Sequence, residues 1–195
     1  SQSFENIRLG NRKNVMLLIG ENLNVISKKT ANALKQKDAS TIKEMALAQA
    51  DAGMDMIDIN LGPARKDGPE LMEWVVKTVQ DVVDLPLSLD TTNIDAIEAG
   101  LKVHRGKALI NSISARPERI EALMPLAKRY DAGFIGLMLG TDGITRDANE
   151  RGFLAAQIMA EAANYGIPEE DIWLDPIVLP IIPSRCRFRV AQNSL

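Results

Sequence analysis

A two-part unit repeats along this sequence and restricts the chain to a small set of folds. Each unit begins with a short apolar run that ends at an acidic or amide side chain, and a stretch with helical spacing follows. Strands that alternate with helices form parallel sheets with right-handed crossover connections. We therefore predict an α/β fold, a TIM (β/α)8-type barrel, with a Rossmann or flavodoxin-like open sheet as the alternative.

The positions of the elements follow from apolar periodicity and from helix start signals. Strands are expected at residues 15–19, 54–59, 85–90, 107–110, 134–139 and 172–174. Helices are expected at residues 29–37, 41–53, 69–83, 94–101, 117–127 and 148–164. Thr41 and Glu44 have the spacing of a capping box, and Pro69 and Pro117 suit the first turn of a helix. His104 follows a predicted helix and is expected at the surface.

The barrel is favoured over the open sheet because the first strand is followed by neither GxGxxG nor GxxxxGK[ST], so neither nucleotide-binding motif is present there. In a barrel, the carboxyl ends of all strands face one mouth, which explains why polar residues recur there. An eight-unit barrel typically needs about 250 residues. With 195 residues, we expect one domain, residues 1–195, truncated after about six units, with an anomalous basic tail at 181–195.

Composition excludes several classes of function. The formal net charge of −3 shows no basic excess, so neither nucleic acid nor an anionic membrane is an expected partner. The apolar runs are too short to span a bilayer and the N-terminal residues do not form a signal peptide, so we expect a cytoplasmic protein. One cysteine and one histidine argue against a zinc site, an iron–sulfur site and a histidine-dependent triad. We therefore expect no metal site, and catalysis that rests on carboxylates, amides and hydroxyls.

The polar residues at the predicted strand ends form one candidate site. They are Glu21, Asn22, Asn24, Asp58, Asn60, Asp90, Asn111 and Asp175. A carboxylate accepts two parallel hydrogen bonds from an amino-pyrimidinone edge, and an amide supplies both a donor and an acceptor, so this set suits a pterin. The alternative is that these residues are ordinary turn formers, with Asp90 acting as a cap where Thr92 or Asn93 starts the next helix.

Five motifs in order resemble those of the methyltetrahydrofolate:corrinoid protein methyltransferases. They are GENLN (20–24), DINLGP (58–63), SLDTTN (88–93), INSIS (110–114) and LDPIVLP (174–180), and the resemblance covers residues 15–180. It implies a barrel that binds methyltetrahydrofolate and passes its methyl group to the cobalt(I) of a corrinoid, or cobalamin, carried by another protein. It also implies that Asp90, Asn111 and Asp175 hydrogen-bond the pterin, and it suggests a homodimer.

Within this resemblance, Asp175 and Asn111 are the candidate catalytic residues. Glu21, Asn24, Asp58 and Asn60 are further candidates for binding the pterin. The family's GLSN-like motif after the seventh strand is absent, so we expect methyl transfer to be impaired. A non-catalytic pterin-binding fragment is the alternative. A dihydropteroate synthase-like enzyme is disfavoured because the NxTPDSFSDGG pattern and the late Lys and Ser-x-Arg are missing.

Overall fold

The computed structural model describes residues 16–63, 65–144 and 147–177. Its main sheet has six parallel strands in the order β1-β2-β3-β4-β5-β8. The strands are β1 (Ile19–Asn24), β2 (Met56–Gly62), β3 (Leu87–Thr91), β4 (Leu109–Ser114), β5 (Gly133–Leu137) and β8 (Ile172–Asp175). A separate antiparallel pair consists of β6 (Leu139–Gly140) and β7 (Gly143–Ile144). The predicted strand start at residue 15 and the tail at 181–195 lie outside the described residues.

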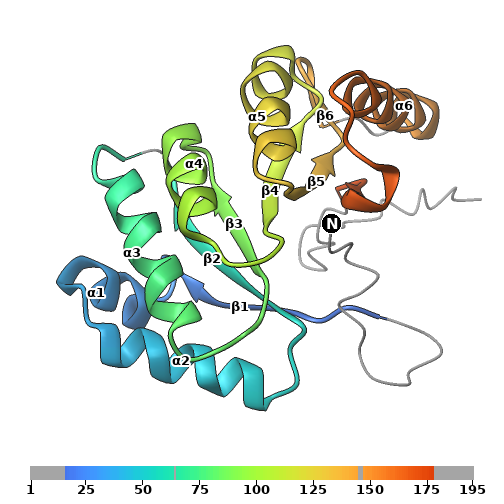
Figure 1. Cartoon of the computed structure of the whole chain (residues 1–195). Coiled ribbons are helices and arrows are strands. Elements are labelled where there is room, and N and C mark those ends of the chain that lie inside the picture. The colour runs from blue at the N-terminus through green and yellow to red at the C-terminus, as the bar shows by residue number, and fades with distance from the viewer. Residues whose placement is uncertain (1–15, 64, 145–146, 178–195) are drawn as a thin grey trace, which may run out of the picture.

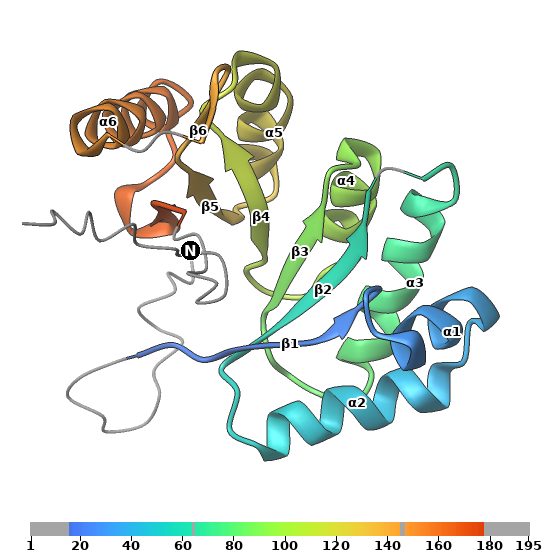
Figure 2. The ribbon, with the colours of Figure 1, turned by 180° about the vertical axis from the view of Figure 1, so that it is seen from behind.

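Helices follow the strands in the alternation that the sequence predicts. They are α1 (Lys28–Gln36), α2 (Ala39–Asp51), α3 (Gly68–Gln80), α4 (Ile94–Val103), α5 (Pro117–Arg129) and α6 (Ala148–Asn164), with a short 3-10 helix at Glu169–Asp171. Helices α1 to α4 lie along one side of β1 to β3, and α5 and α6 continue this layer beside β4 and β5 (Figures 1 and 2).

The order of the strands distinguishes between the two predicted folds. Every strand of the main sheet pairs with the next one along the chain, from β1 through β5 to β8. A doubly wound Rossmann or flavodoxin-like sheet reverses its strand order at a switch point, whereas a barrel adds its strands in sequence. The α/β prediction is confirmed, and the winding is that of the barrel. Within the described residues, β1 and β8 are the two edges of the sheet.

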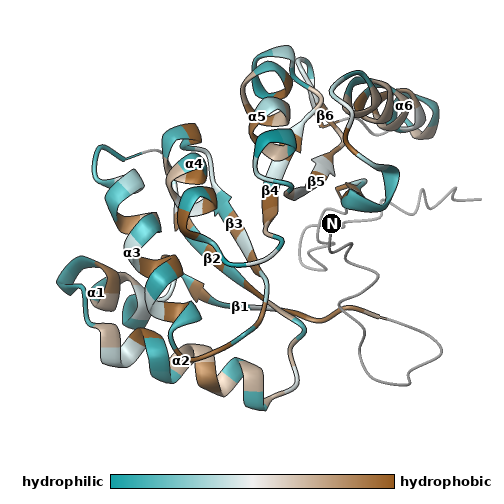
Figure 3. Cartoon of the chain, viewed as in Figure 1, coloured by the Kyte–Doolittle hydropathy of each residue, from teal (hydrophilic) through white to brown (hydrophobic). Residues whose placement is uncertain are grey.

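The hydrophobic core lies between the helices and the sheet, and α3 with the turn after it contributes a row of apolar side chains to it. The residues with helical spacing in this segment are all buried: Leu71, Met72, Val75, Val76, Val79 and Val83. They pack in the same cluster as Ile57 and Leu89 of the neighbouring strands. Apolar residues accordingly concentrate in the strands and on the inner faces of the helices (Figure 3). Burial of these side chains supplies most of the stability that helix propensity alone cannot give.

Three strands, β1, β2 and β4, run three to five residues further than predicted, because the polar residues expected beyond them belong to the strands. Strand β1 covers Ile19–Asn24, so GENLN pairs with β2 rather than forming a loop, and β2 and β4 end at Gly62 and Ser114. Successive side chains point to opposite faces of a sheet, so the apolar residues pack against the helices while the alternate positions hold polar groups. In β1, a register shift between Gly20 and Leu23 leaves the two intervening polar residues exposed.

The predicted fifth strand at 134–139 is wrong at its carboxyl end. Strand β5 stops at Leu137, where it pairs with Asp175 of β8, and the backbone N–H of Met138 donates to the carbonyl of Asp175 at 3.0 Å. Leu139 then begins the antiparallel pair, whose turn reaches Gly143 at a φ of 96°. A positive φ suits glycine, so the turn residues redirect the chain where the apolar run alone predicts a continuing strand.

His104 is half-buried, and its predicted place at the surface is wrong. Its Nε2 accepts a hydrogen bond from the backbone N–H of Leu87 at 3.1 Å, at the start of β3. Burial lowers the pKa of His104 to about 4, although the neighbouring Gly106 carbonyl opposes this shift. The neutral ring therefore serves as a hydrogen-bond acceptor for an otherwise unpaired strand end.

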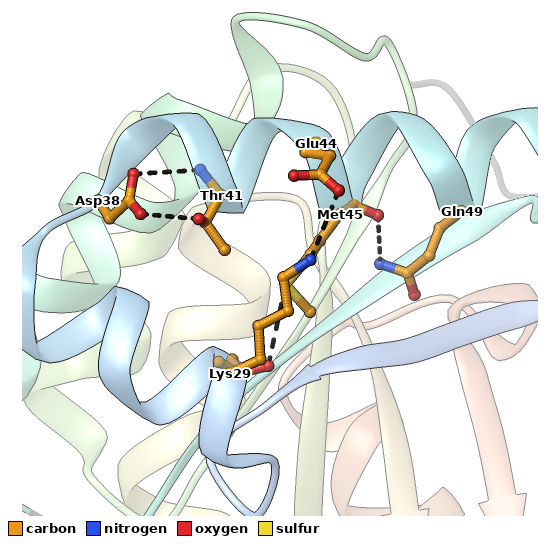
Figure 4. Close-up of polar contacts among 7 residues, drawn as sticks. Lys29, Asp38, Thr41, Glu44, Met45 and Gln49 are labelled. Carbon is orange, nitrogen blue, oxygen red and sulfur yellow. Dashed lines mark hydrogen bonds and ion pairs between the residues drawn. The ribbon is translucent and has the colours of Figure 1, made fainter.

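Helix α2 begins with a different cap from the predicted box. The Asp38 carboxylate accepts from the backbone N–H of Thr41 at 3.2 Å and from its hydroxyl at 2.7 Å, while Glu44 pairs with Lys29 at 3.5 Å (Figure 4). We expect Asp38→Ala to lower the midpoint of thermal unfolding by about 2–4 °C, because a helix N–H loses its partner. Calorimetry checks this, with Ser40→Ala as the matched control, and equal midpoints for the two variants would contradict it.

Candidate functional site

Four polar residues lie level with one another on adjacent strands near the carboxyl ends of the sheet. Asn24 of β1 pairs in register with Asn60 of β2, Asn60 with Asp90 of β3, and Asp90 with Asn111 of β4. Residues in register on neighbouring strands lie within contact distance. We call these four residues the polar row. Parallel pairing of consecutive strands thus assembles side chains that are far apart in the sequence.

Hydrogen bonds connect the polar row to a second layer, two residues earlier on the strands. The carboxylate oxygen Oδ1 of Asp58 accepts from the Ser88 hydroxyl at 2.6 Å and from the Asn111 amide at 3.1 Å. The Asn60 amide nitrogen donates to the Asp90 carboxylate, while its oxygen Oδ1 accepts from a backbone N–H in the same strand. The two carboxylates therefore lie in two hydrogen-bonded groups, one of Asp58, Ser88 and Asn111 and one of Asn60 and Asp90. The charge of Asp58 acts on Asp90, and we call the two groups together the network.

An apolar layer lies on the same face of the sheet, toward the amino ends of the strands. Met56 is two residues before Asp58, and Leu109 is two residues before Asn111. Met56 and Leu109 are both buried, and Ile19, Ile135 and Trp173 pack against them. This face consequently offers hydrogen-bonding groups at one end and an apolar floor beneath them, as sites for small heterocycles do.

Burial and mutual repulsion hold the carboxylates of this network closer to neutrality than ordinary surface acids. Burial raises the pKa of Asp58, against the hydrogen bonds from Ser88 and Asn111, and the charge of Glu21 raises it further. Burial, and after it the charge of Asp58, raises the pKa of Asp90 to about 6. A strongly shifted carboxyl at the end of a parallel strand is a physical sign of a functional site.

Two clefts open beside the polar row. A cleft of about 360 Å³ is lined by Glu21, Asn22, Asn24, Ser27, Lys29, Glu44, Met45 and Ala48. The other, of about 370 Å³, is lined by Asp90, Thr91, Thr92, Asn111, Ser112, Ser114, Arg116, Arg119, Leu137 and Leu139. Both lie in the size range of small-molecule sites. We call the second one the β3–β4 cleft, because Asp90 and Asn111 of the polar row open into it.

The structure does not bring every predicted residue into this network. Asp175 is exposed on the edge strand β8, where its carboxylate accepts from the backbone N–H of Ile177 at 2.8 Å. Glu21 is exposed at the register shift of β1 and acts on the network only through its charge. The Asn24 side chain accepts from the backbone N–H of Ile26 at 2.9 Å, which is a turn contact. Asp58, Asn60, Asp90 and Asn111 are the predicted residues that share hydrogen bonds.

The alternative reading of Asp90 as a helix cap is wrong. Helix α4 is capped by Asn93, whose side-chain oxygen accepts from the backbone N–H of Ala96 at 3.3 Å. Asp90 accepts from Asn60 instead. A cap three residues further along satisfies the helix, so the Asp90 carboxylate is available for another role.

Sequence reasoning missed two residues that support the site. Ser88 donates to Asp58, and its place two residues before Asp90 on one strand could have revealed that both share a face. Gln49 of α2 is buried, and its Oε1 accepts from the backbone N–H of Asn22 at 3.1 Å. Its Nε2 donates to the carbonyl of Met45 (Figure 4). No sequence pattern marks Gln49, because its contact depends on how α2 packs beside β1.

Two kinds of feature are absent from residues 16–63, 65–144 and 147–177, a metal-binding cluster and a membrane-spanning helix. Among these residues, no group of three or more His, Cys, Asp or Glu side chains converges closely enough to hold a metal ion. None of the helices in this part of the chain has both the length and the apolar character that crossing a bilayer requires. Cys186 lies outside the described residues.

Comparisons with known proteins are consistent with this geometry. Residues 20–185 match the family described as pterin binding enzyme. A methylcorrinoid:tetrahydrofolate methyltransferase from Eubacterium limosum is 27% identical over 168 residues, which are 85% of this chain and 62% of that protein. The chain thus spans less than two thirds of the length of this relative.

Solved structures of dihydropteroate synthases share the fold. The enzyme from Clostridium difficile, crystallised with pteroic acid, superposes with a TM-score of 0.63 at 24% identity, covering 85% of this chain and 65% of that one. The enzyme from Xanthomonas albilineans gives a TM-score of 0.59 at 21% identity, covering 82% of this chain and 59% of its own. At these identities, the likeness establishes the architecture alone.

Proposed function

Because the chain belongs to the pterin-binding enzyme family, we propose that its polar row binds the pterin ring of a tetrahydrofolate and that the protein transfers a methyl group between this folate and a corrinoid carried by a partner protein. The observation that carries the proposal is the half-buried Asp90 carboxylate, which accepts from the Asn60 amide, is repelled by the charge of Asp58 and lies on the same face as an apolar floor. The similarity to a methylcorrinoid:tetrahydrofolate methyltransferase supports the choice of reaction.

The hydrogen-bonding groups of the row match those of a pterin. The amino-pyrimidinone edge presents two adjacent N–H donors, and an ionised Asp90 accepts both in parallel. Asn60 and Asn111 supply amides on either side of it, in register on the flanking strands. The neutral ring needs no countercharge, so a site of carboxylates and amides recognises it without histidine or metal.

The proposed methyl transfer requires little covalent chemistry from the side chains of this protein. When methyl leaves N5 of methyltetrahydrofolate, the N–C bond breaks, its electron pair stays on N5, and N5 gains a proton. The nucleophile is the partner's corrinoid. A hydrogen bond to N5 that strengthens as the bond breaks therefore accelerates the step. We propose Asn111 and the exposed Asp175 for this role, with Glu21, Asn24 and Asp58 completing the polar surroundings of the ring.

The direction of transfer follows from the supply of substrates. The sequence prediction runs from the folate to the corrinoid, whereas the name of the relative runs from methylcorrinoid to tetrahydrofolate. Both directions pass through the same transition state, so the same residues serve both. A corrinoid protein is the proposed partner in either case, and a homodimer is the proposed assembly.

Methyl transfer and pterin binding are tested separately. We expect calorimetry to detect binding of 5-methyltetrahydrofolate, and the visible spectrum of a purified corrinoid protein to change as its methyl group is exchanged. Asn111→Ala should slow transfer by about 10–100-fold, since one polarising donor is lost, while Asn164→Ala on the exposed side of α6 should not. Binding without transfer would identify a non-catalytic pterin-binding protein. Absence of binding would refute the proposal altogether.

A further inference from the structure

The β3–β4 cleft carries positive charge in addition to the carboxylate of the polar row. Arg119 is half-buried there, and its two terminal nitrogens donate to the carbonyls of Thr92 at 3.0 Å and Ser112 at 3.1 Å. Arg116 donates through Nε to the carbonyl of Gly140 at 3.2 Å. Both arginines line the cleft together with Asp90. Backbone carbonyls thus hold two guanidinium groups in fixed positions at its wall.

These two positive charges have no acidic partner in the part of the chain that the structure describes. The ion pairs found there do not include Arg116 or Arg119, although Arg65 and Arg129 pair with Asp67 at 2.9 Å and Glu98 at 3.2 Å. Burial lowers the pKa of Arg119, and nearby Glu118 only partly opposes this effect. Neutral carbonyls orient a guanidinium but do not cancel its charge, so the two arginines attract an anion into the cleft.

The cleft is therefore lined by charges of both signs, the Asp90 carboxylate and two guanidinium groups. Leu137 and Leu139 line it as well, so an apolar group can lie along the wall. Resting on the proposed function, we propose that Arg116 and Arg119 bind an anionic substituent of the pterin ligand. The site then recognises a pterin that carries a carboxylate or phosphate tail, in preference to the bare ring.

Ligands that share the ring and differ in the tail test this inference. We would measure dissociation constants by calorimetry for 6-methyltetrahydropterin, for 5-methyltetrahydrofolate, for its triglutamate, and for 6-hydroxymethyl-dihydropterin diphosphate. The tailed ligands should bind about 5–20-fold more tightly than the bare ring at low salt, and the advantage should shrink as salt is raised. If the triglutamate gains more affinity over the bare ring than the diphosphate does, a carboxylate is the preferred anion. If the diphosphate gains more, a phosphate is preferred.

Arginine variants locate the effect. Arg116→Gln and Arg119→Gln should each remove most of the tail advantage and leave affinity for 6-methyltetrahydropterin within about twofold. Arg129→Gln, at the far end of the same helix, also removes one positive charge. It should change neither the tail advantage nor the affinity for 6-methyltetrahydropterin. Arg116 bonds to one carbonyl only, so this variant stays informative if Arg119→Gln unfolds.

Each contrary result has a distinct meaning. Equal affinities of the wild-type protein for tailed and bare ligands would overturn the inference and leave the proposed function intact. An equal loss for both kinds of ligand in the arginine variants would show that the arginines only support the loops, which also overturns it. Failure of the wild-type protein to bind any of the four ligands would overturn the proposed function, and the tail inference with it.

Discussion

Replacing Asp90 with asparagine is expected to weaken binding of 5-methyltetrahydrofolate by about 10–100-fold, because hydrogen bonds to a charged group contribute about 1.5–3 kcal/mol. The same substitution should stabilise the unliganded protein. Asparagine has no charge to bury beside Asp58, and its amide oxygen can still accept from Asn60. Activity and stability thus oppose each other at this position, as they do at many functional sites.

The free energy of unfolding should also depend on pH, because the folded protein buries the charge of Asp90. The pKa of Asp90 is raised from 3.8 in the unfolded chain to about 6 in the folded protein, by burial first and by the charge of Asp58 second. Between these two values the folded state holds the extra proton, so the free energy of unfolding falls as pH rises from about 4 to 6. The loss is about 1–2 kcal/mol after allowance for solvent screening, and it persists at pH 7.

Chemical denaturation at pH 5 and pH 7.5 measures this effect, and calorimetry measures the affinity. Asp90→Asn should remove this contribution to the pH slope and raise the free energy of unfolding at pH 7.5. Asp84→Asn, an exposed control, should change neither property. His104 acts in the opposite sense, since its pKa is lowered to about 4 and stability falls as pH drops below about 6.5. Its contribution cancels between variants. A less stable Asp90→Asn protein, or one with unchanged affinity, would contradict the prediction.

Lys107→Met is expected to lower the free energy of unfolding by about 3–5 kcal/mol, the largest effect on stability expected here. The ammonium group of Lys107 lies 2.7 Å from the Asp171 carboxylate and 3.1 Å from that of Asp131. Lys107 and Asp171 are both buried, at 6% and 2% exposure. Removing the lysine therefore leaves a buried carboxylate without its counterion, which costs far more than an exposed pair would.

Two further variants test whether the loss of stability comes from the unpaired buried charge. Lys102→Met removes an exposed pair with Glu98 on α4 and should cost at most about 0.5 kcal/mol. The double variant Lys107→Met/Asp171→Leu removes both buried charges and should recover most of the lost stability. Urea denaturation of the four proteins checks both points. If Lys107→Met proved no more costly than Lys102→Met, the buried pair would not be a major support of β4 and β8.

The sequence alone predicts the order and type of nearly all the elements, because apolar periodicity is a local property. The apolar residues with helical spacing at 71–83, in α3 and the turn after it, are the clearest case, since each of them is buried. The ends of the strands could not be predicted so well. Asn60 and Asn111 were expected beyond their strands because they are polar, but they are paired within β2 and β4. Whether a polar residue belongs to a strand depends on its neighbouring strand and on the face it occupies, and neither is visible in a single segment.

The residues of the candidate site likewise divide into those whose grouping could be predicted from the sequence and those whose place could not. The four residues Asp58, Asn60, Asp90 and Asn111 were predicted together and lie in the two hydrogen-bonded groups of the network, because the motifs that contain them fall on consecutive strands of the sheet. Asp175 was grouped with them for the same reason. Its place on β8 is level with Leu137, whereas Asn111 is level with Ile135, so register separates it from the row. Register arises from pairing across the whole sheet and not from the motif.

The consecutive winding of the sheet also bears on how the protein assembles. Every strand of the main sheet pairs with the next strand of that sheet along the chain, so the loops that these pairings close are shorter than those of other strand orders. Asn60, Asp90 and Asn111 come from three successive units. The hydrogen-bonding surface formed by these three residues is therefore complete once β2, β3 and β4 have paired. A pterin bound there would contact all three strands and so stabilise their association.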